Sequence, residues 1–489
     1  MTSTTGTTMP RIAKFTQKKD LPFREYTLVL TPNGGDRNYS FSDIVSFRIA
    51  LGNDKLRCIY GSQTYGTFQI QLTSSVAVTG VTQVTFNGSS NSIFSRITTT
   101  SNGGVLEDFN KCNVYIPVVY DLTVGTDVRN NYFSFFGNST TPFGSTASAS
   151  PTVETCKTGA QIYTTTSAIN VASAFRSFGF IIPSIIGSFS KKLFPISEIV
   201  GSNVDMDMYL DTITNALVID AALTITSTVM NRFRLNLSVI EYNSTITEVV
   251  RRAYNHTFVI PCISIQTYSN IITTTSTGNF TWNINASLKN AKGMLFTFRD
   301  TTTQTQNLFS LTNRTSLGML QAQLTIGSYT FPANRYLLYD CSQSIASSAN
   351  TTLTYPGYAN FINFWMSAMK YFGQGIDNYA RSSTNFDQFT RCRNNGASQT
   401  NGSFVLAFNL EGLHDSDDEF RSCIPLDGNT TALNFTTGIP STAPGATTPI
   451  TTNTTNVECF IMYEFDVVIS QGVAIATNKY NDFSNDTLK

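Results

Sequence analysis

Apolar and polar positions alternate along much of the chain, which is the pattern of strands with one buried face. In the clearest case, at 204–210, the apolar residues Val204, Met206, Met208 and Leu210 alternate with polar ones. Apolar runs or alternation between turn residues predict further strands at 26–30, 67–72, 114–119, 232–240, 281–284, 294–298, 320–326, 404–410 and 460–469. Strands separated by long irregular loops favour an all-β fold of antiparallel sandwiches over βαβ units.

One helix is predicted, over residues 356–373. Pro356 and Gly373 suit its two ends. Its apolar residues fall on one stripe at helical spacing, namely Tyr358, Phe361, Ile362, Trp365 and Met369. We interpret this stripe as a face that packs on a sheet, which makes Trp365 a core residue. A second, shorter turn or helical corner is predicted around Pro195.

Stretches without this patterning divide the chain. Residues 1–20 carry Arg11, Lys14, Lys18 and Lys19 among Thr and Ser, and are predicted to form a flexible basic arm. Two polar stretches are predicted to be long surface loops. The predicted organisation is an arm at 1–20, a first domain at 21–240 with a loop at 137–156, a connection at 241–256, a second domain at 257–480 with a Thr-rich loop at 428–457, and a tail at 481–489.

The composition agrees with two β-rich domains. The chain has 489 residues, of which 41% are hydrophobic and 12% aromatic, so it can bury two cores. Charged residues make up only 13%, about half of the usual share, and Thr, Ser and Asn must supply much of the exposed surface. The formal net charge is zero, which excludes a strong field that would attract the whole protein to nucleic acid or an anionic membrane.

The absence of a signal-peptide core and the scattered cysteines favour a protein that is not secreted. The first 23 residues contain no apolar signal-peptide core, and no stretch reaches the roughly 18 continuous apolar residues of a membrane span. The many N-x-S/T sequons follow from the abundance of Asn, Ser and Thr. Eight cysteines are scattered without metal-binding spacing, and we expect reduced, mostly buried thiols.

No residues are predicted to be catalytic, to bind a cofactor or to bind a metal. His256 and His414 lie near no nucleophile motif. The acidic run at 415–419 lacks the spacing of a calcium-binding loop and is interpreted as a solvated loop. Neither phosphate-binding glycine motif is present. These observations favour a protein without enzymatic activity.

Several blocks resemble a viral family. The motif I-P-x-x-x-G-x-x-S-x-K-x-x-P runs from Ile182 to Pro195, before the alternating strand. It resembles a block in the major capsid proteins of small eukaryotic DNA viruses, such as polinton-like viruses, virophages and adintoviruses. Residues 87–113 are similar to the family's G-x-x-S-L-F-x-R-L … L-E hairpin, through Ser92, Phe94, Arg96, Leu106, Glu107 and Asn110. Further similar blocks follow in the family's order at 258–264, 285–299, 321–332, 404–411 and 460–473.

The resemblance, over about residues 25–478, implies a double jelly roll, which is two consecutive eight-stranded antiparallel sandwiches. It also implies a homotrimer whose pseudo-hexagonal units tile an icosahedral shell, with penton and minor capsid proteins as partners. The basic arm could reach an internal membrane, and no sequence-specific nucleic acid binding is implied. The expected location is the virion, assembled in the infected cell.

The loops at 137–156 and 428–457 depart from the family pattern. The composition also fits a β-sandwich adhesin or receptor-binding surface protein, although the missing signal peptide weakens that reading. A glycan-active enzyme would need two carboxylates at a defined separation, and no spacing selects such a pair.

Overall fold

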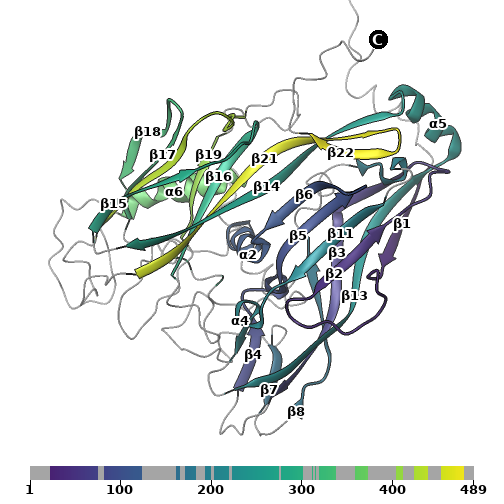
Figure 1. Cartoon of the computed structure of the whole chain (residues 1–489), viewed down its shortest axis with the longest axis horizontal. Coiled ribbons are helices and arrows are strands. Elements are labelled where there is room, and N and C mark those ends of the chain that lie inside the picture. The colour runs from purple at the N-terminus through teal and green to yellow at the C-terminus, as the bar shows by residue number, and fades with distance from the viewer. Residues whose placement is uncertain are drawn as a thin grey trace, which may run out of the picture.

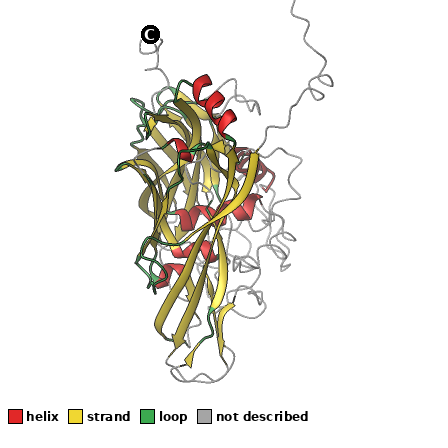
Figure 2. Cartoon of the chain, turned by 90° about the vertical axis from the view of Figure 1, so that its right-hand side faces the viewer, coloured by secondary structure: helices red, strands yellow, loops and turns green. Residues whose placement is uncertain are grey.

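Strands make up most of the described structure, and the helices are short (Figure 2). The computed structural model describes residues 23–74, 82–123, 161–165, 171–182, 193–199, 203–219, 223–274, 277–300, 311, 314, 319–337, 358–372, 404–410, 423–438 and 453–477. Within these residues, each sheet is formed by strands of one half of the chain only. We call residues 23–242 the N-terminal half and residues 257–477 the C-terminal half.

The N-terminal half contains three antiparallel sheets. Sheet A has the order β1-β13-β3-β10, with β8 and β9 also paired to β3; sheet B has the order β2-β11-β5-β6; and sheet C has the order β12-β4-β7. The elements are β1 (Phe23–Leu30), β2 (Ile44–Ile49), β3 (Arg57–Ser74), β4 (Thr82–Phe86), η1 (Ser90–Ile93), β5 (Phe94–Ser101), β6 (Gly104–Asn110), α2 (Cys112–Thr123), β7 (Gln161–Thr165), β8 (Val171–Ala172), β9 (Arg176–Ile181), β10 (Leu193–Phe194), η3 (Ile196–Glu198), β11 (Val204–Leu210), α4 (Ile213–Ala216), β12 (Leu217–Ile219) and β13 (Ile225–Tyr242).

The C-terminal half contains two antiparallel sheets. Sheet D has the order β14-β21-β16-β19, with β22 also paired to β21, and sheet E has the order β15-β20-β17-β18. The elements are β14 (Thr257–Thr274), β15 (Thr277–Ile284), β16 (Ala291–Asp300), β17 (Met319–Ile326), β18 (Tyr329–Leu337), α6 (Tyr358–Tyr371), β19 (Leu406–Asn409), β20 (Thr431–Gly438), β21 (Asn453–Ser470) and β22 (Val473–Thr477). Helix α5 (Ser244–Ala253) connects the two halves.

The two halves repeat one strand order. In sheets A and D, the first strand of the half pairs with an 18-residue strand near its end, β13 or β21. In sheets B and E, the second strand of the half lies at one edge, and a hairpin followed by a helix lies at the other, β5–β6 with α2 or β17–β18 with α6. Each half is thus a jelly roll of two four-stranded sheets with added strands. No repeat is visible in the sequence, because the strand order constrains polarity patterns and not particular residues.

Aromatic residues fill the core between the facing sheets. In the N-terminal half, the rings of Phe94 in β5 and Phe180 in β9 lie 4.8 Å apart. Phe180 also lies over its partner Gly66 in the neighbouring strand β3, where an added Cβ would come within 1.9 Å of the ring, so this position requires glycine. In the C-terminal half, Trp282 of sheet E packs edge-on against Phe296 of sheet D at 5.9 Å.

Helix α5 is fixed to the N-terminal half (Figure 1). Asn243 caps it by accepting a hydrogen bond from the Ile246 amide at 2.9 Å. The Thr247 hydroxyl accepts from the Leu56 amide at 2.8 Å, and the Arg251 guanidinium pairs with Glu198 at 2.8 Å. The helix therefore sets where the chain leaves the first half.

Most of the strand predictions are confirmed. The alternation at 204–210 is β11, whose residues are buried and half-buried in strict alternation. The predicted helix is α6, in which Trp365 and Met369 are buried, while Pro356 and Gly373 lie outside the described residues. The corner at Pro195 is the 3-10 helix η3. The arm at 1–20, the loop at 137–156 and the tail at 481–489 also lie entirely outside the described residues.

Two predictions are wrong. Residues 114–119 form part of helix α2 and not a strand, because an apolar run buried on all sides has no period that separates the two. The Thr-rich segment 428–457 is not all loop, since it contains β20 and the start of β21. Leu433 and Phe435 of β20 are buried in the core, and Asn434 and Thr436 lie on the outer side. Threonine here is a strand residue.

Candidate functional site

The junction between the two halves is the candidate functional site, because it fixes how the two jelly rolls stand side by side. Strands β14, β21 and β22 extend from the C-terminal half across β5 and β6 (Figure 1). Helix α2 lies beneath this extension and also meets α6. The N-terminal half thus presents one hairpin and one helix to the second half.

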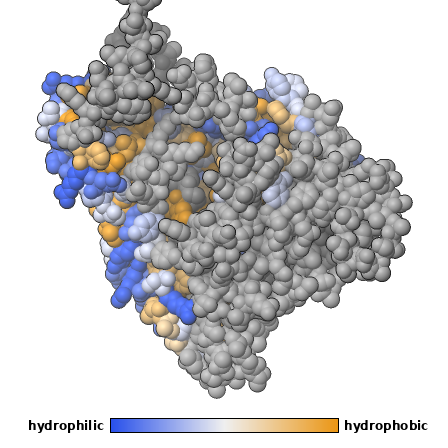
Figure 3. All heavy atoms as spheres, turned by 180° about the vertical axis from the view of Figure 1, so that it is seen from behind, coloured by the Kyte–Doolittle hydropathy of each residue, from blue (hydrophilic) through white to orange (hydrophobic). Residues whose placement is uncertain are grey.

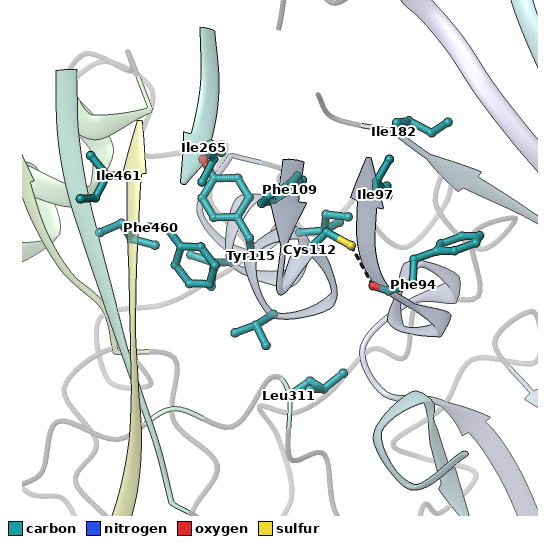
Figure 4. Close-up of a cluster of buried hydrophobic side chains, with 14 of the residues drawn as sticks. Phe94, Ile97, Phe109, Cys112, Tyr115, Ile182, Ile265, Leu311, Phe460 and Ile461 are labelled. Carbon is teal, nitrogen blue, oxygen red and sulfur yellow. Dashed lines mark hydrogen bonds between the residues drawn. The ribbon is translucent and has the colours of Figure 1, made fainter. Parts of the chain in front are cut away.

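Tyr115 of α2 is the aromatic centre of the junction. Figure 4 shows its side chain between Phe109 of β6 and Phe460 of β21. The ring centroids lie 5.6 Å from Phe109, 5.2 Å from Phe460 and 6.3 Å from Phe372. The Tyr115 hydroxyl also shares a side-chain hydrogen bond with Tyr371, and burial raises the pKa of both phenols. Tyr115 therefore joins β21 and the end of α6, both in the C-terminal half, to the N-terminal half.

Polar groups hold the strands of the junction in register. The Ser264 hydroxyl of β14 donates to the buried Glu107 carboxylate of β6. The Thr267 hydroxyl donates to the Asn110 carbonyl at 2.8 Å. Burial raises the pKa of the neighbouring Tyr463 phenol, and the Glu107 charge adds to the effect. These bonds join strands that an apolar contact alone would leave free to slide.

A polar cavity of about 310 Å³ lies beside this junction. Three of its charged lining groups, Arg96, Asp211 and Arg299, already have partners, and Lys111 is exposed. Arg96 forms two 2.7 Å bonds to Asp108, and Arg299 pairs with Glu458. Asp211 accepts bonds from amide groups, including that of Asn113 at 2.5 Å. Among the described residues that line the cavity, no acid, base and nucleophile are arranged together.

The residues of the hairpin motif at 87–113 build the N-terminal side of the junction. Glu107 and Asn110 contact the C-terminal half as described above, and Arg96 lines the cavity. The Ser92 hydroxyl donates to the Ala216 carbonyl at 2.6 Å, which fixes the start of the hairpin. Phe94 and Leu106 are buried in the core. The motif therefore shapes the surface on which the second half rests.

The other residues considered in the sequence do not gather into a site. His256 is exposed in the turn after α5. The other histidine, His414, and the acidic run at 415–419 lie outside the described residues. Within the described ranges, no group of three or more His, Cys, Asp and Glu side chains could hold a metal ion, and no helix is long and apolar enough to cross a membrane.

The five described cysteines differ in burial. Cys58, Cys112, Cys262 and Cys459 are buried, and Cys423 is half-buried. Burial raises the pKa of the Cys58 thiol to about 12, with a smaller effect of the Glu198 charge. Burial likewise raises the pKa of Cys112 and Cys459.

We expect Cys58, Cys112 and Cys459 to resist alkylation in the native protein. The thiolate is the reactive form, and a raised pKa keeps these thiols protonated at pH 8. Peptide mass spectrometry after iodoacetamide treatment, with and without guanidinium chloride, measures this. Modification of the three thiols in native buffer as fast as in denaturant would contradict the buried positions.

The outer sides of three strands of sheet E, β15, β17 and β20, are polar but uncharged. Strands β15, β17 and β20 contain no charged residue. Their outward side chains bond across the strands. The Thr281 hydroxyl donates to the side-chain oxygen of Asn434 at 2.8 Å. The Thr436 hydroxyl donates to the side-chain oxygen of Asn279 at 2.6 Å and accepts from the Gln321 side-chain amide at 2.9 Å. The face is a ladder of amides and hydroxyls.

Solved structures match the whole arrangement. VP54 of PBCV-1, as fitted into a reconstruction of the virophage Sputnik, has a TM-score of 0.57 at 10% identity, over 94% of this chain and 97% of that one. The Faustovirus major capsid protein has a TM-score of 0.54 at 10% identity, over 93% and 92%. The mavirus major capsid protein has a TM-score of 0.53 at 10% identity, over 93% and 90%.

This chain has the double jelly-roll fold of viral major capsid proteins. No protein-family model matches the sequence, and no curated protein matches it. The double jelly roll accounts for the repeated strand order and for the junction, which is the contact between its two sandwiches. The fold class inferred from the sequence blocks is confirmed.

Sequence reasoning missed most of the junction. Tyr115 fell in a segment predicted to be a strand, and Ser264 and Phe460 looked like ordinary strand residues. Glu107 and Ser264 are 157 positions apart, so no local pattern could pair them. The one available signal was the hairpin motif at 87–113, which contains Glu107 and Asn110.

Proposed function

We propose that this chain is a viral major capsid protein, a non-enzymatic shell subunit of the virion. The observation that carries the proposal is the complete double jelly roll, which extends over 93–94% of the chain in each of the three comparisons. In this proposal the sandwiches occupy residues 21–240 and 257–480, with 241–256 as the connection between them.

The functional unit in this proposal is a homotrimer. Because the two halves repeat one strand order, three copies supply six similar sandwiches around one axis. Such a ring is pseudo-hexagonal and can tile an icosahedral shell around a genome. The repeat supports this assembly, since a chain with two unlike domains would not approximate sixfold packing.

The outer face of sheet E suits contacts between such units. Burying a charge without a partner is costly, whereas amides and hydroxyls exchange their bonds to water for bonds to a neighbour. The polar groups on strands β15, β17 and β20 are amides and hydroxyls, without charges. A surface of this kind can meet a neighbouring unit without leaving a charge unpaired.

Further partners belong to the same proposal and rest on the resemblance. They are penton and minor capsid proteins and, through the basic arm at 1–20, an internal membrane. The zero formal net charge supports a shell protein that binds no specific nucleic acid sequence. The chain would assemble in the infected cell and would not be secreted.

We expect the purified chain to be a trimer in solution. Its mass should be about 161 kDa, three times the 53.7 kDa chain, because a closed ring buries the same interface on every copy. Size exclusion coupled to light scattering over a hundredfold range of protein concentration measures this. Larger shells that dissociate to the trimer would equally support the proposal.

A folded monomer of 53.7 kDa at every concentration would overturn the proposal. Circular dichroism of the same sample shows whether that monomer is folded. The adhesin alternative would then be tested by screening the monomer against glycans.

A further inference from the structure

Exposed apolar side chains do not single out a docking face. On the face of the molecule seen in Figure 3, hydrophobic residues of the described surface are interspersed with hydrophilic ones. Apolar side chains scattered in this way are ordinary at protein surfaces and need no partner. The stronger candidate for a binding site is the polar cavity of about 310 Å³ beside the junction.

The described lining of this cavity combines exposed, half-buried and buried groups. Asn110, at the end of β6, and Lys111, directly before α2, are exposed. Asn456 of β21 is half-buried, whereas Val114 of α2 and Leu311 are buried. The volume lies at the lower end of the roughly 300–1,000 Å³ of small-ligand pockets, so it suits one small ring and not a long chain.

Lys111 is the cation of this lining that forms no ion pair within the described residues. The two lining arginines already pair with acids. The lining acid, Asp211, is not paired with Lys111, because its carboxylate is held by neighbouring amides. It accepts from the main-chain amide of Thr212 at 2.6 Å and from the side-chain amide of Asn215 at 3.1 Å. An anionic group bound in the cavity would give Lys111 the charge-assisted bond that it lacks.

Uncharged groups of the cavity also have hydrogen bonds left to make. The side-chain oxygen of Asn113 accepts no bond from another described residue, although this residue is only 2% exposed. The side-chain amides of Asn110 and Asn456 make none with other described residues either. A buried acceptor without a partner is costly, and an amide group both donates and accepts. Hydroxyl groups, which also do both, are matching partners for these amides.

We propose that the cavity binds one acidic sugar unit, which is a pyranose ring that carries a carboxylate. The carboxylate pairs with Lys111, and the ring hydroxyls bond to the three asparagine amides. The apolar C–H face of the ring packs against Val114 and Leu311. This binding function goes beyond the proposed shell role and does not depend on the trimer.

The bound sugar would connect the two halves of the chain. Lys111 belongs to the N-terminal half and Asn456 to the C-terminal half, so both halves contribute to one site. Because the assembled site exists only in the folded chain, the ligand should raise the melting temperature.

The first test titrates the purified full chain with methyl glucuronide, methyl glucoside and acetate, by calorimetry and by ligand-observed NMR. The two glycosides differ only in the carboxylate, and acetate carries the charge without the ring. We expect methyl glucuronide to bind with a dissociation constant of about 1 mM, the scale for a ligand of this size. The glucoside and acetate should bind at least about tenfold more weakly, since each lacks one set of bonds.

Three results of this titration would overturn the inference. One is equal affinity for the two glycosides, and another is acetate binding as tightly as the glucuronide. The third is no binding of the glucuronide at roughly ten times the expected dissociation constant.

The second test compares Lys111→Met with Lys289→Met, after circular dichroism has shown that both proteins are folded. Lys289 is also exposed but does not line the cavity. Lys111→Met should bind the two glycosides alike, and Lys289→Met should keep the preference for the glucuronide. A Lys111→Met protein that keeps this preference contradicts the site. Neither test measures the oligomeric state, so a failure here leaves the proposed function standing.

Discussion

Replacing Arg299 by methionine is expected to lower the free energy of unfolding by about 3–5 kcal/mol. Only 4% of the Arg299 side chain and 2% of its partner Glu458 are exposed. The Glu458 carboxylate also accepts a bond from the Thr297 hydroxyl at 2.9 Å. Removing the guanidinium would leave this carboxylate charged and buried on the face of sheet D that meets the junction.

Guanidinium unfolding at one fixed protein concentration measures this effect. The control is Arg48→Met, because the Arg48–Asp205 pair is 54% and 32% exposed, and an exposed pair contributes only about 0–1 kcal/mol. A double variant, Arg299→Met with Glu458→Met, should recover most of the loss, since it removes both charges. An Arg299→Met protein no less stable than Arg48→Met would refute the buried pair.

Replacing Tyr115 by alanine is expected to cost about 3–5 kcal/mol, the range for removing a buried aromatic ring. Tyr115 is 3% exposed and contacts rings from both halves, so the cavity would open within the junction itself. Tyr115→Phe keeps the ring and loses only the bond to Tyr371, with an expected cost of about 0.5–1.5 kcal/mol.

The matched control is Tyr329→Ala, since Tyr329 is 65% exposed in β18. Its effect should stay within about 0.5 kcal/mol. The same unfolding titration serves all three variants. If Tyr115→Ala and Tyr329→Ala unfolded at the same denaturant concentration, Tyr115 could not be the centre of the junction.

The elements that could be predicted from the sequence are those whose apolar and polar residues alternate at a regular spacing. Segment 204–210 has a polar residue at every second position because one side faces solvent, and it was assigned correctly as β11. Helix α2 was missed because Val114, Ile116 and Val118 are all buried, so no polar face marks the helical turn. Strand β20 did alternate, through Leu433 and Phe435, but the abundance of Thr around it was interpreted as loop.

The junction could be predicted only in part. The hairpin at 87–113 was singled out by its resemblance to a family motif. The structure places two of its residues, Glu107 and Asn110, against β14. Their partners Ser264 and Thr267 could not be identified, because pairing across 157 positions depends on how two complete sandwiches dock. The buried Arg299–Glu458 pair was likewise hidden among strand residues with ordinary spacing.

The amide and hydroxyl ladder on sheet E has a consequence for how a contact made through it would depend on dissolved salt. Ion pairs at a surface weaken as dissolved salt rises, because the screening length is only about 8 Å at physiological ionic strength and shrinks further in brine. The ladder from Asn279 to Gln321 carries no charge for salt to screen. Contacts made through this face would hold about equally well in fresh water, inside a cell and in the sea.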